Sequence, residues 1–174
     1  MIAEAYRLLL LMLALTLTQV VSASANQTLN GDDFSLVGSG RLHWWGISIY
    51  DAALYAPADG YRPERPHYLE ITYLKDFSRK QLVDRTLAEI ERLHGARSDR
   101  EAVLSELSAI FTDVSAGNRL FALHRPGEGV EFYSEERLLG RLDEATLAAD
   151  FFSIWLDPDT SEPELRERLL GYLQ

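Results

Sequence analysis

The chain has 174 residues, of which 47% are hydrophobic and 25% charged, a composition typical of one folded globular domain and not of a disordered segment. Its formal net charge of −10 at pH 7 repels phosphates, which argues against nucleic acid and anionic lipid headgroups as the main partners. The absence of cysteine excludes disulfide bonds and thiolate metal sites.

The N-terminal segment has the pattern of an export signal. Arg7 precedes an apolar run over residues 8–21, and Ala23-Ser24-Ala25 supplies the small residues that a signal peptidase requires. The run is too short and interrupted for a comfortable membrane span of about 20 residues. We therefore expect a cleaved signal peptide over 1–25, a single mature domain over 26–174 without an integral membrane span, and a periplasmic or secreted location. An uncleaved anchor is the alternative.

The first part of the mature chain predicts strands, because apolar and polar residues alternate with a period of two. A short strand is expected over residues 34–37, ended by a bend at Gly38-Ser39-Gly40. A second strand is expected over 45–50, and a third over 69–73, after a proline-rich turn.

The period then changes to that of helices. Ser78 with Gln81 forms a capping box, and the helix that it opens is expected to stop at Gly95. A second capping box, Ser98 with Glu101, predicts another helix immediately afterwards.

The last third of the chain predicts a hairpin followed by helices. Strands are expected over residues 120–124 and 130–133, with a further one over 137–142. Asp143 is expected to cap one helix, and residues 162–173 to form the last. This order predicts an α+β domain in which a large antiparallel sheet is backed by a layer of helices.

The usual catalytic and metal-binding patterns are missing. His43, His67, His94 and His124 have no ligand partners at metal-site spacing, so we expect them to be surface or strand residues. Gly38-Ser39-Gly40 lacks the spacing of a nucleophile elbow and the residues of a phosphate loop. No metal, cofactor or acid/base pair is therefore expected.

Aromatic residues gather after one arginine. Arg41 is followed closely by Trp44, Trp45, Tyr50 and Tyr55. Because strand neighbours alternate between faces, one face is expected to meet the helices and the other to line a cleft with an arginine at its end. Such a cleft suits a ligand with an apolar body and an anionic head. The alternative is that the aromatic residues are ordinary core and Arg41 lies on the surface.

Six segments stand out by their order and spacing: Leu36-Val37-Gly38-Ser39-Gly40, residues 45–55, residues 73–78, Gly117-Asn118-Arg119-Leu120, residues 151–157 and Leu169-Leu170-Gly171. Together they resemble the bacterial chalcone isomerase-like family. The resemblance covers about residues 34–171 and implies an open-faced β-sandwich, a large antiparallel sheet backed by helices.

The resemblance also implies that catalytic groups of the plant isomerases have been lost. Arg41 is the nearest candidate for the arginine that steers cyclisation in those enzymes, but Trp45 and Phe77 fall where a threonine and a tyrosine position a water. Asp84 falls near an asparagine, and only Ser153 keeps the chemistry of its counterpart threonine. An isomerase so altered lacks most of its stabilising hydrogen bonds, so the protein is expected to be non-catalytic.

The leading hypothesis is a binding protein for a small amphipathic ligand such as a fatty acid, as in the plant fatty-acid-binding members of the family. Arg41 pairs with the carboxylate in this hypothesis, and Tyr50 or Tyr55 donates a second hydrogen bond. The acyl chain lies among Trp44, Trp45, Phe151, Phe152 and Trp155. One alternative is an accessory protein of an envelope complex, with a protein partner, an empty or filled-in cleft and a large exposed apolar patch. The other is an isomerase, that is, an intramolecular lyase, with residual activity.

Overall fold

A computed structural model describes residues 34–173, so the predicted signal peptide lies outside the described residues. The strands are β1 (Phe34–Trp44), β2 (Ile47–Pro57), β3 (His67–Tyr73), β4 (Arg119–Arg125), β5 (Gly129–Tyr133) and β6 (Leu138–Leu142). The helices are α3 (Arg79–His94), α4 (Arg100–Ile110), α5 (Ala145–Leu156) and α6 (Pro163–Leu169).

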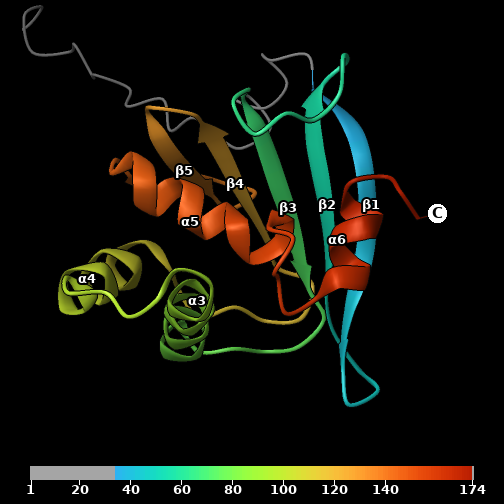
Figure 1. The fold of residues 1–174 in the computed structure, drawn as a ribbon. Coiled ribbons are helices and arrows are strands. Elements are labelled where there is room, and N and C mark those ends of the chain that lie inside the picture. Colours follow the sequence, from blue (N-terminus) through green and yellow to red (C-terminus); the bar gives the residue numbers. More distant parts are fainter. Residues whose placement is uncertain (1–33, 174) are drawn as a thin grey trace, which may run out of the picture.

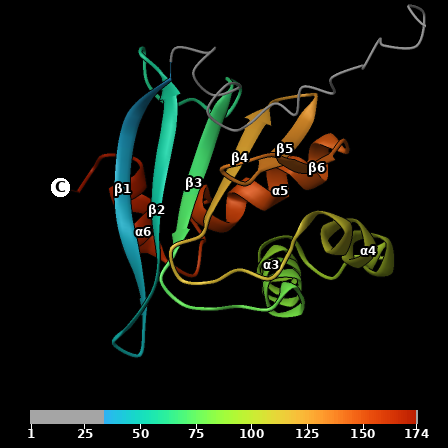
Figure 2. The ribbon, with the colours of Figure 1, turned by 180° about the vertical axis from the view of Figure 1, so that it is seen from behind.

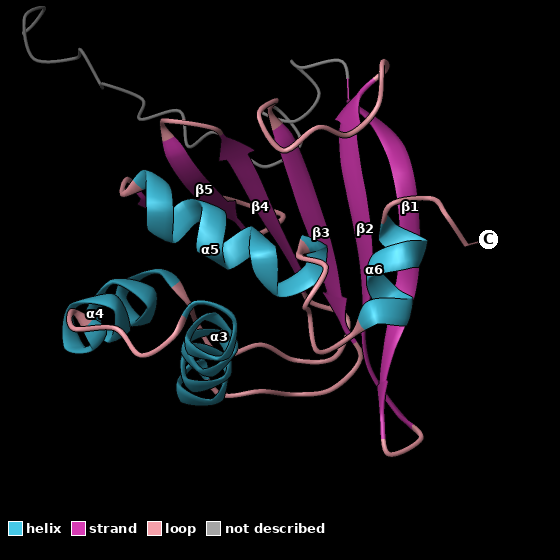
Figure 3. Ribbon diagram, in the orientation of Figure 1, coloured by secondary structure: helices cyan, strands magenta, loops and turns pink. Residues whose placement is uncertain are grey.

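The six strands form one sheet in chain order, and every neighbouring pair is antiparallel. The described helices all lie on one face of this sheet (Figures 1 and 2). Figure 3 shows the same arrangement coloured by secondary structure. The predicted α+β class, a large antiparallel sheet backed by helices, is confirmed.

The main core lies between the sheet and the helices. Alternate residues of the central strands, such as Leu54, Leu69 and Ala122, are fully buried there, as expected for a sheet with one face against helices. A smaller cluster on the other face is built around Tyr68 and Phe121. The two clusters show that neighbouring residues of one strand serve different faces.

The first strand is longer than predicted, and the expected bend at Gly38-Ser39-Gly40 is wrong. These residues lie inside β1, which continues to Trp44. The glycines make room for α6, because a Cβ atom on Gly38 would lie 2.1 Å from the Arg168 carbonyl oxygen and one on Gly40 would lie 2.8 Å from a Leu165 methyl. Close approach of a helix, not a change of chain direction, explains the glycines here.

The β1–β2 connection corrects the strand predicted over 45–50. Trp44 pairs with Ile47, so Trp45 and Gly46 alone form the hairpin turn. Both have positive φ, 51° and 77° respectively, as the two central residues of a type I′ turn do. Trp45 therefore occupies a turn and not a strand.

The helix-start predictions have mixed outcomes. The capping box of Ser78 with Gln81 is present, and Gly95 ends α3 with a positive φ of 87°. The second capping box is wrong, because α4 starts after Asp99, whose side chain makes no capping bond and instead pairs with Arg97 at 2.9 Å.

The C-terminal helices also start or end at other residues than predicted. Glu144, not Asp143, caps α5, and its carboxylate accepts hydrogen bonds from the backbone N–H groups of Thr146 and Leu147. The last helix, α6, stops at Leu169, well before the predicted end at residue 173. The predicted hairpin of β4 and β5 and the strand β6 are confirmed.

Candidate functional site

The main candidate site is a cavity of about 340 Å³ between the sheet and helices α3 and α5. Its sheet side is formed by Leu42, Trp44, Ile49, Tyr50, Ile71 and Tyr73. Its helix side is formed mainly by Phe77, Gln81, Leu82, Arg85, Thr86, Glu89, Phe151, Ile154 and Trp155, with Ser161 and Glu162 beside them.

The cavity exists because α3 does not pack down on the sheet. This helix makes its main contacts with α4 and α5. In Figure 1 it lies below α5 and beside the lower end of the sheet. The side chains of α3 that point toward β1, β2 and β3 therefore leave space between the layers. Short segments on either side, around Phe77 and Ser161, close part of that space.

Aromatic side chains with buried hydroxyls form the floor. The Trp155 indole N–H donates to the Tyr50 hydroxyl oxygen at 2.9 Å, which leaves the Tyr50 hydroxyl proton available for another acceptor. Burial raises the pKa of Tyr50 and of Tyr73 far above the usual range. Both hydroxyls are therefore neutral hydrogen-bond donors at physiological pH.

The opposite edge of the cavity is polar. Gln81, Arg85 and Glu89 follow one another at intervals of four residues on α3, so they share a face of the helix. Arg85 is the only basic residue among the described residues of the lining. Its guanidinium contacts Glu89 at 2.6 Å, and its side chain is 69% exposed. A solvent-exposed cation at the edge of an apolar space is placed to pair with an anionic ligand group.

Glu89 does not depend on Arg85 for its charge balance. Its carboxylate also accepts hydrogen bonds from Arg92 at 2.9 Å and from the Ser161 hydroxyl at 3.1 Å. Burial raises the pKa of the neighbouring Glu162, and the positive charge of Arg85 opposes that rise. Arg85 is thus free to exchange partners while Glu89 stays satisfied.

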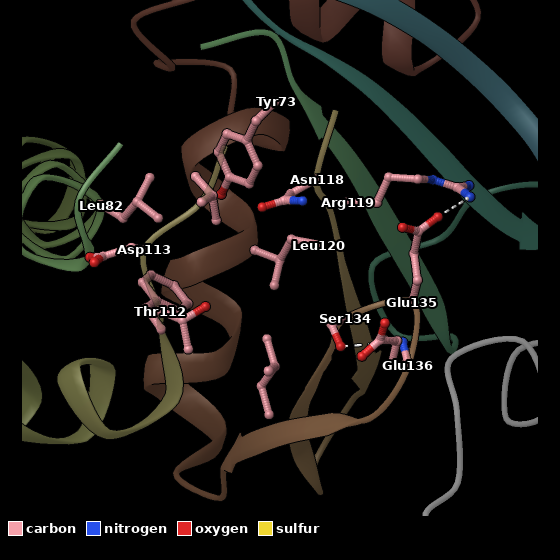
Figure 4. A pocket seen from close by; sticks show the side chains of 13 residues that line it. Tyr73, Leu82, Thr112, Asp113, Asn118, Arg119, Leu120, Ser134, Glu135 and Glu136 are labelled. Carbon is pink, nitrogen blue, oxygen red and sulfur yellow. Dashed lines mark hydrogen bonds and ion pairs between the residues drawn. The ribbon is translucent and has the colours of Figure 1, made fainter. Parts of the chain in front are cut away.

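A second, smaller cavity of about 220 Å³ adjoins the first. The two share a wall of four residues, Tyr73, Leu82, Phe111 and Leu120. Figure 4 shows that Arg119 and Glu135 at its rim point toward each other, with an ion pair of 3.2 Å. Arg119, the one basic residue of this lining within the described chain, is thus already paired with Glu135, and it also pairs with Glu70, so this cavity offers an anionic ligand a weaker anchor than the first.

The structure brings together only some of the predicted site residues. Trp44, Tyr50 and Phe77 line the main cavity, and so do Phe151 and Trp155 from the predicted acyl-chain group. Trp44 and Tyr50 reach it from the face that meets the helices. The expected cleft and the helix-covered face are therefore the same side of the sheet, not opposite sides.

Arg41 and Tyr55 lie on the other face. In the strand register Arg41 is opposite Asp51, whereas its neighbour Leu42 turns toward the cavity. Arg41 makes a two-bond ion pair with Asp51, at 2.6 and 2.8 Å, and this hydrogen bonding holds the pKa of Asp51 below its usual range. Tyr55 stacks on Tyr68 at 4.5 Å. Neither residue is placed to contact a ligand in the cavity.

Asp84 and Ser153 also lie outside the cavity lining. Asp84 projects from the exposed side of α3 and pairs with Lys80 one turn away. The Ser153 hydroxyl contacts the His94 Nε2 atom at 2.8 Å. Both are explained by local contacts between or along helices. Of the positions compared with the isomerases, only Phe77 therefore lines this cavity.

Phe152 and Trp45 complete the set that the structure separates from the cavity. Phe152 stacks on His124 within the core at 4.9 Å, and Trp45 is 88% exposed at the hairpin turn. The histidines His67 and His124, which show no pairing in the sequence, contact each other across β3 and β4 at 3.4 Å.

Sequence reasoning missed Arg85 as a candidate anchor. The available signal was the i, i+4 series of Gln81, Arg85 and Glu89 beside the apolar stripe of the first helix. That pattern equally describes a solvated helix edge. This edge of α3 lines a cavity only because the helix is separated from the sheet.

Two further searches of residues 34–173 bear on the kind of site. No group of three or more histidine or acidic side chains in this range is arranged to hold a metal ion. None of the helices described is both long enough and apolar enough to cross a bilayer.

The described residues form a single-sheet α+β domain with an apolar cavity between the sheet and its helix layer. The family model for chalcone isomerase-like proteins matches residues 16–171, so the chain belongs to the chalcone isomerase-like family.

A solved structure and a curated sequence are among its relatives. A fatty-acid binding protein of Arabidopsis thaliana superposes with a TM-score of 0.63 and 14% identity, covering 82% of this chain and 89% of the plant chain. An uncharacterized protein of Haemophilus influenzae is 28% identical over 136 residues, which cover 78% of this chain and 67% of the relative. The plant protein shares the fold of this chain.

Proposed function

We propose that the protein binds a fatty acid, or a similar amphipathic carboxylate, in the cavity between the sheet and helices α3 and α5. The acyl chain lies along Trp44, Phe151 and Trp155, and the carboxylate pairs with Arg85. The observation that carries this proposal is an apolar cavity whose one basic lining residue, within the described chain, stands at its polar edge.

The size and chemistry of the cavity support the proposal. Its 340 Å³ lies within the range of about 300–1,000 Å³ that small-molecule pockets occupy. Apolar walls with a few placed polar groups are typical of such pockets. The printed description of the plant structure, a fatty-acid binding protein, is consistent with the same ligand class.

We further propose that the ligand is held without being turned over. No histidine lines the cavity among residues 34–173, and burial keeps Tyr50 and Tyr73 protonated, so the two tyrosines donate hydrogen bonds but do not act as bases near neutral pH. Two carboxylates, Glu89 and Glu162, also line the cavity. Glu89 is held by Arg85, Arg92 and Ser161. This leaves Glu162 as the one carboxylate of the lining, among the described residues, whose role as a base has to be excluded by experiment. We also propose that the protein is exported and binds its ligand outside the cytoplasm, which the signal-like pattern of residues 1–25 supports.

The test compares two arginines that the structure places on opposite faces. Calorimetric titration with dodecanoate is expected to show that Arg85→Gln weakens binding by about three- to tenfold, since a charged hydrogen bond contributes about 1.5 kcal/mol or less where solvent screens it. The matched variant Arg41→Gln is expected to bind as the wild type does, because Arg41 pairs with Asp51 away from the cavity.

Methyl dodecanoate separates the carboxylate contact from the rest of the site. The ester has no charge to pair with Arg85, so the wild type and Arg85→Gln should bind it equally. A loss of dodecanoate affinity in Arg41→Gln but not in Arg85→Gln would move the carboxylate to the other face of the sheet. Absence of binding by the wild type would contradict the proposed function itself.

A further inference from the structure

The β1–β2 hairpin carries a concentrated apolar tip. It extends beyond the rest of the sheet at the lower end in Figures 1 and 3. Trp44, Trp45 and Ile47 at its end are 64%, 88% and 50% exposed. Three of the seven large hydrophobic side chains that are exposed within the described chain thus lie in four consecutive positions.

The tip is also free of charged residues. Residues 42–50 contain no Asp, Glu, Lys or Arg, although 25% of the chain is charged. Arg41 and Asp51, which bound this stretch, neutralise each other in an ion pair. A surface of this kind enters an apolar environment without the cost of desolvating a charge.

Trp45 does not stabilise the fold. It takes a positive φ of 51°, a conformation that costs about 1–2 kcal/mol in residues other than glycine and that type I′ turns usually assign to Asn or Gly. Its exposed ring adds almost nothing to the core. A large aromatic residue at a position that disfavours it indicates that its side chain contacts another molecule.

The tip adjoins the proposed ligand site. Trp44 is both an exposed residue of the tip and a lining residue of the main cavity. Leu42 and Ile49, further along the same two strands, line the cavity as well. Whatever the tip contacts is therefore next to the cavity.

We propose that this hairpin tip inserts into the headgroup region of a zwitterionic lipid bilayer. Tryptophan is enriched at membrane interfaces, where its ring is apolar and its N–H finds a hydrogen-bond partner. The net charge of −10 opposes approach to anionic bilayers but not to neutral ones. A stable protein interface needs about 20–30 residues on each side, far more than the tip presents, whereas a bilayer can be contacted by a few side chains.

This docking gives the cavity direct access to the place where fatty acids partition. That consequence rests on the proposed function, but association with vesicles does not. The orientation also fits the fold, because the tip projects beyond the helices and meets a flat surface before they do (Figure 2).

The test is co-sedimentation of the protein, as the cell processes it and with its N-terminus identified by intact mass, with phosphatidylcholine vesicles. Trp45→Asn creates the preferred Asn-Gly turn, so it should unfold at the same temperature as the wild type or higher. Its vesicle partition coefficient should fall about tenfold, a change of about 1.4 kcal/mol, because the variant buries no large apolar ring at this position in the bilayer. Tyr172→Asn, which removes an exposed aromatic residue elsewhere, should partition as the wild type does.

Several results would overturn the proposal. One is that the wild type does not bind phosphatidylcholine vesicles, and another is that Trp45→Asn binds them as well as the wild type does. A third is that the protein binds phosphatidylglycerol vesicles more tightly and that Trp45→Asn does not change this binding. Binding to cell membranes but not to protein-free vesicles would replace the lipid with a protein partner. Dodecanoate titration keeps the two proposals apart. Trp45→Asn should keep the wild-type dodecanoate affinity, because Trp45 does not line the cavity. Dodecanoate binding by the wild type without vesicle binding contradicts only the docking proposal, and vesicle binding by the wild type without dodecanoate binding contradicts only the proposed ligand.

Discussion

At the scale of single residues, His67 shows how burial sets a charge state. It is 1% exposed, and its Nδ1 atom lies 2.8 Å from the Arg65 carbonyl oxygen. Since a carbonyl only accepts, Nδ1 carries the proton, and Nε2 is left to accept from His124 at 3.4 Å. Burial lowers the pKa of His67 to about 4 and also lowers the pKa of His124.

This pair predicts a loss of stability in mild acid. Above pH 6.5 His67 is neutral in both the folded and the unfolded chain and contributes no pH dependence. Between pH 6.5 and 4 the unfolded chain binds the proton more readily, so the free energy of unfolding falls as the pH falls, by about 2 kcal/mol at pH 5. Urea unfolding at pH 7.5, 6 and 5 measures this slope.

A comparison of variants isolates the contribution of His67. His67→Phe is expected to have a shallower slope between pH 6.5 and 5, whatever its stability at pH 7.5. His43→Gln, which changes an exposed histidine, should keep the wild-type slope. Equal slopes in the wild type and His67→Phe would mean that His67 is not the group responsible.

At the scale of elements, the seam between β1 and α6 depends on glycine. A Cβ atom on Gly38 would lie 2.1 Å from the Arg168 carbonyl oxygen and 2.8 Å from that of Leu169. Backbone atoms cannot move aside as a flexible side chain does, so α6 itself must shift.

Gly38→Ala is therefore expected to destabilise the protein by about 1–3 kcal/mol, the usual range for overpacking. Thermal unfolding measures the effect, and the neighbouring exposed Ser39→Ala is the control that adds no volume at the seam. An unchanged melting temperature in Gly38→Ala would show that α6 does not pack on β1 as closely as described.

The same elements show what local sequence patterns can predict. The capping box of Ser78 with Gln81 predicted the start of α3, since every atom of that signal lies within one turn. The bend predicted at Gly38-Ser39-Gly40 was wrong because those glycines are required by the close packing of α6, a helix at the far end of the chain. A strand was predicted at Trp45 in place of the observed turn, because tryptophan is not a residue that this type of turn prefers.

At the scale of the whole molecule, the fold was predictable and the site only in part. Antiparallel strands with helices on one face followed from the order of periodic segments, and the family resemblance agreed with it. Two aromatic residues that the sequence placed beside a cleft, Trp44 and Tyr50, line the cavity of the candidate site.

The choice of arginine was not predictable in the same way. Alternation along β1 separates Arg41 from its neighbour Leu42, but it does not say which face holds the cavity. That depends on where α3 packs, a long-range arrangement with no local signal. Arg85 reaches the cavity only as a result of that packing.

The whole molecule thus combines a net negative charge, an uncharged hairpin tip and a cavity that Trp44 of that tip helps to line. In the proposed function a fatty acid is held between the sheet and helices α3 and α5. The ligand then lies on the helix-covered face, and Tyr55 and Tyr68, on the other face, do not contact it.

The most direct test of this claim is photo-crosslinking with a diazirine-labelled fatty acid, followed by peptide mass spectrometry to locate the adducts. The account predicts labelling of the cavity lining, at residues such as Phe77, Leu82 and Ile154, and competition by unlabelled dodecanoate. Labelling at Tyr55 or Tyr68 instead, or no labelling that dodecanoate can compete away, would contradict it.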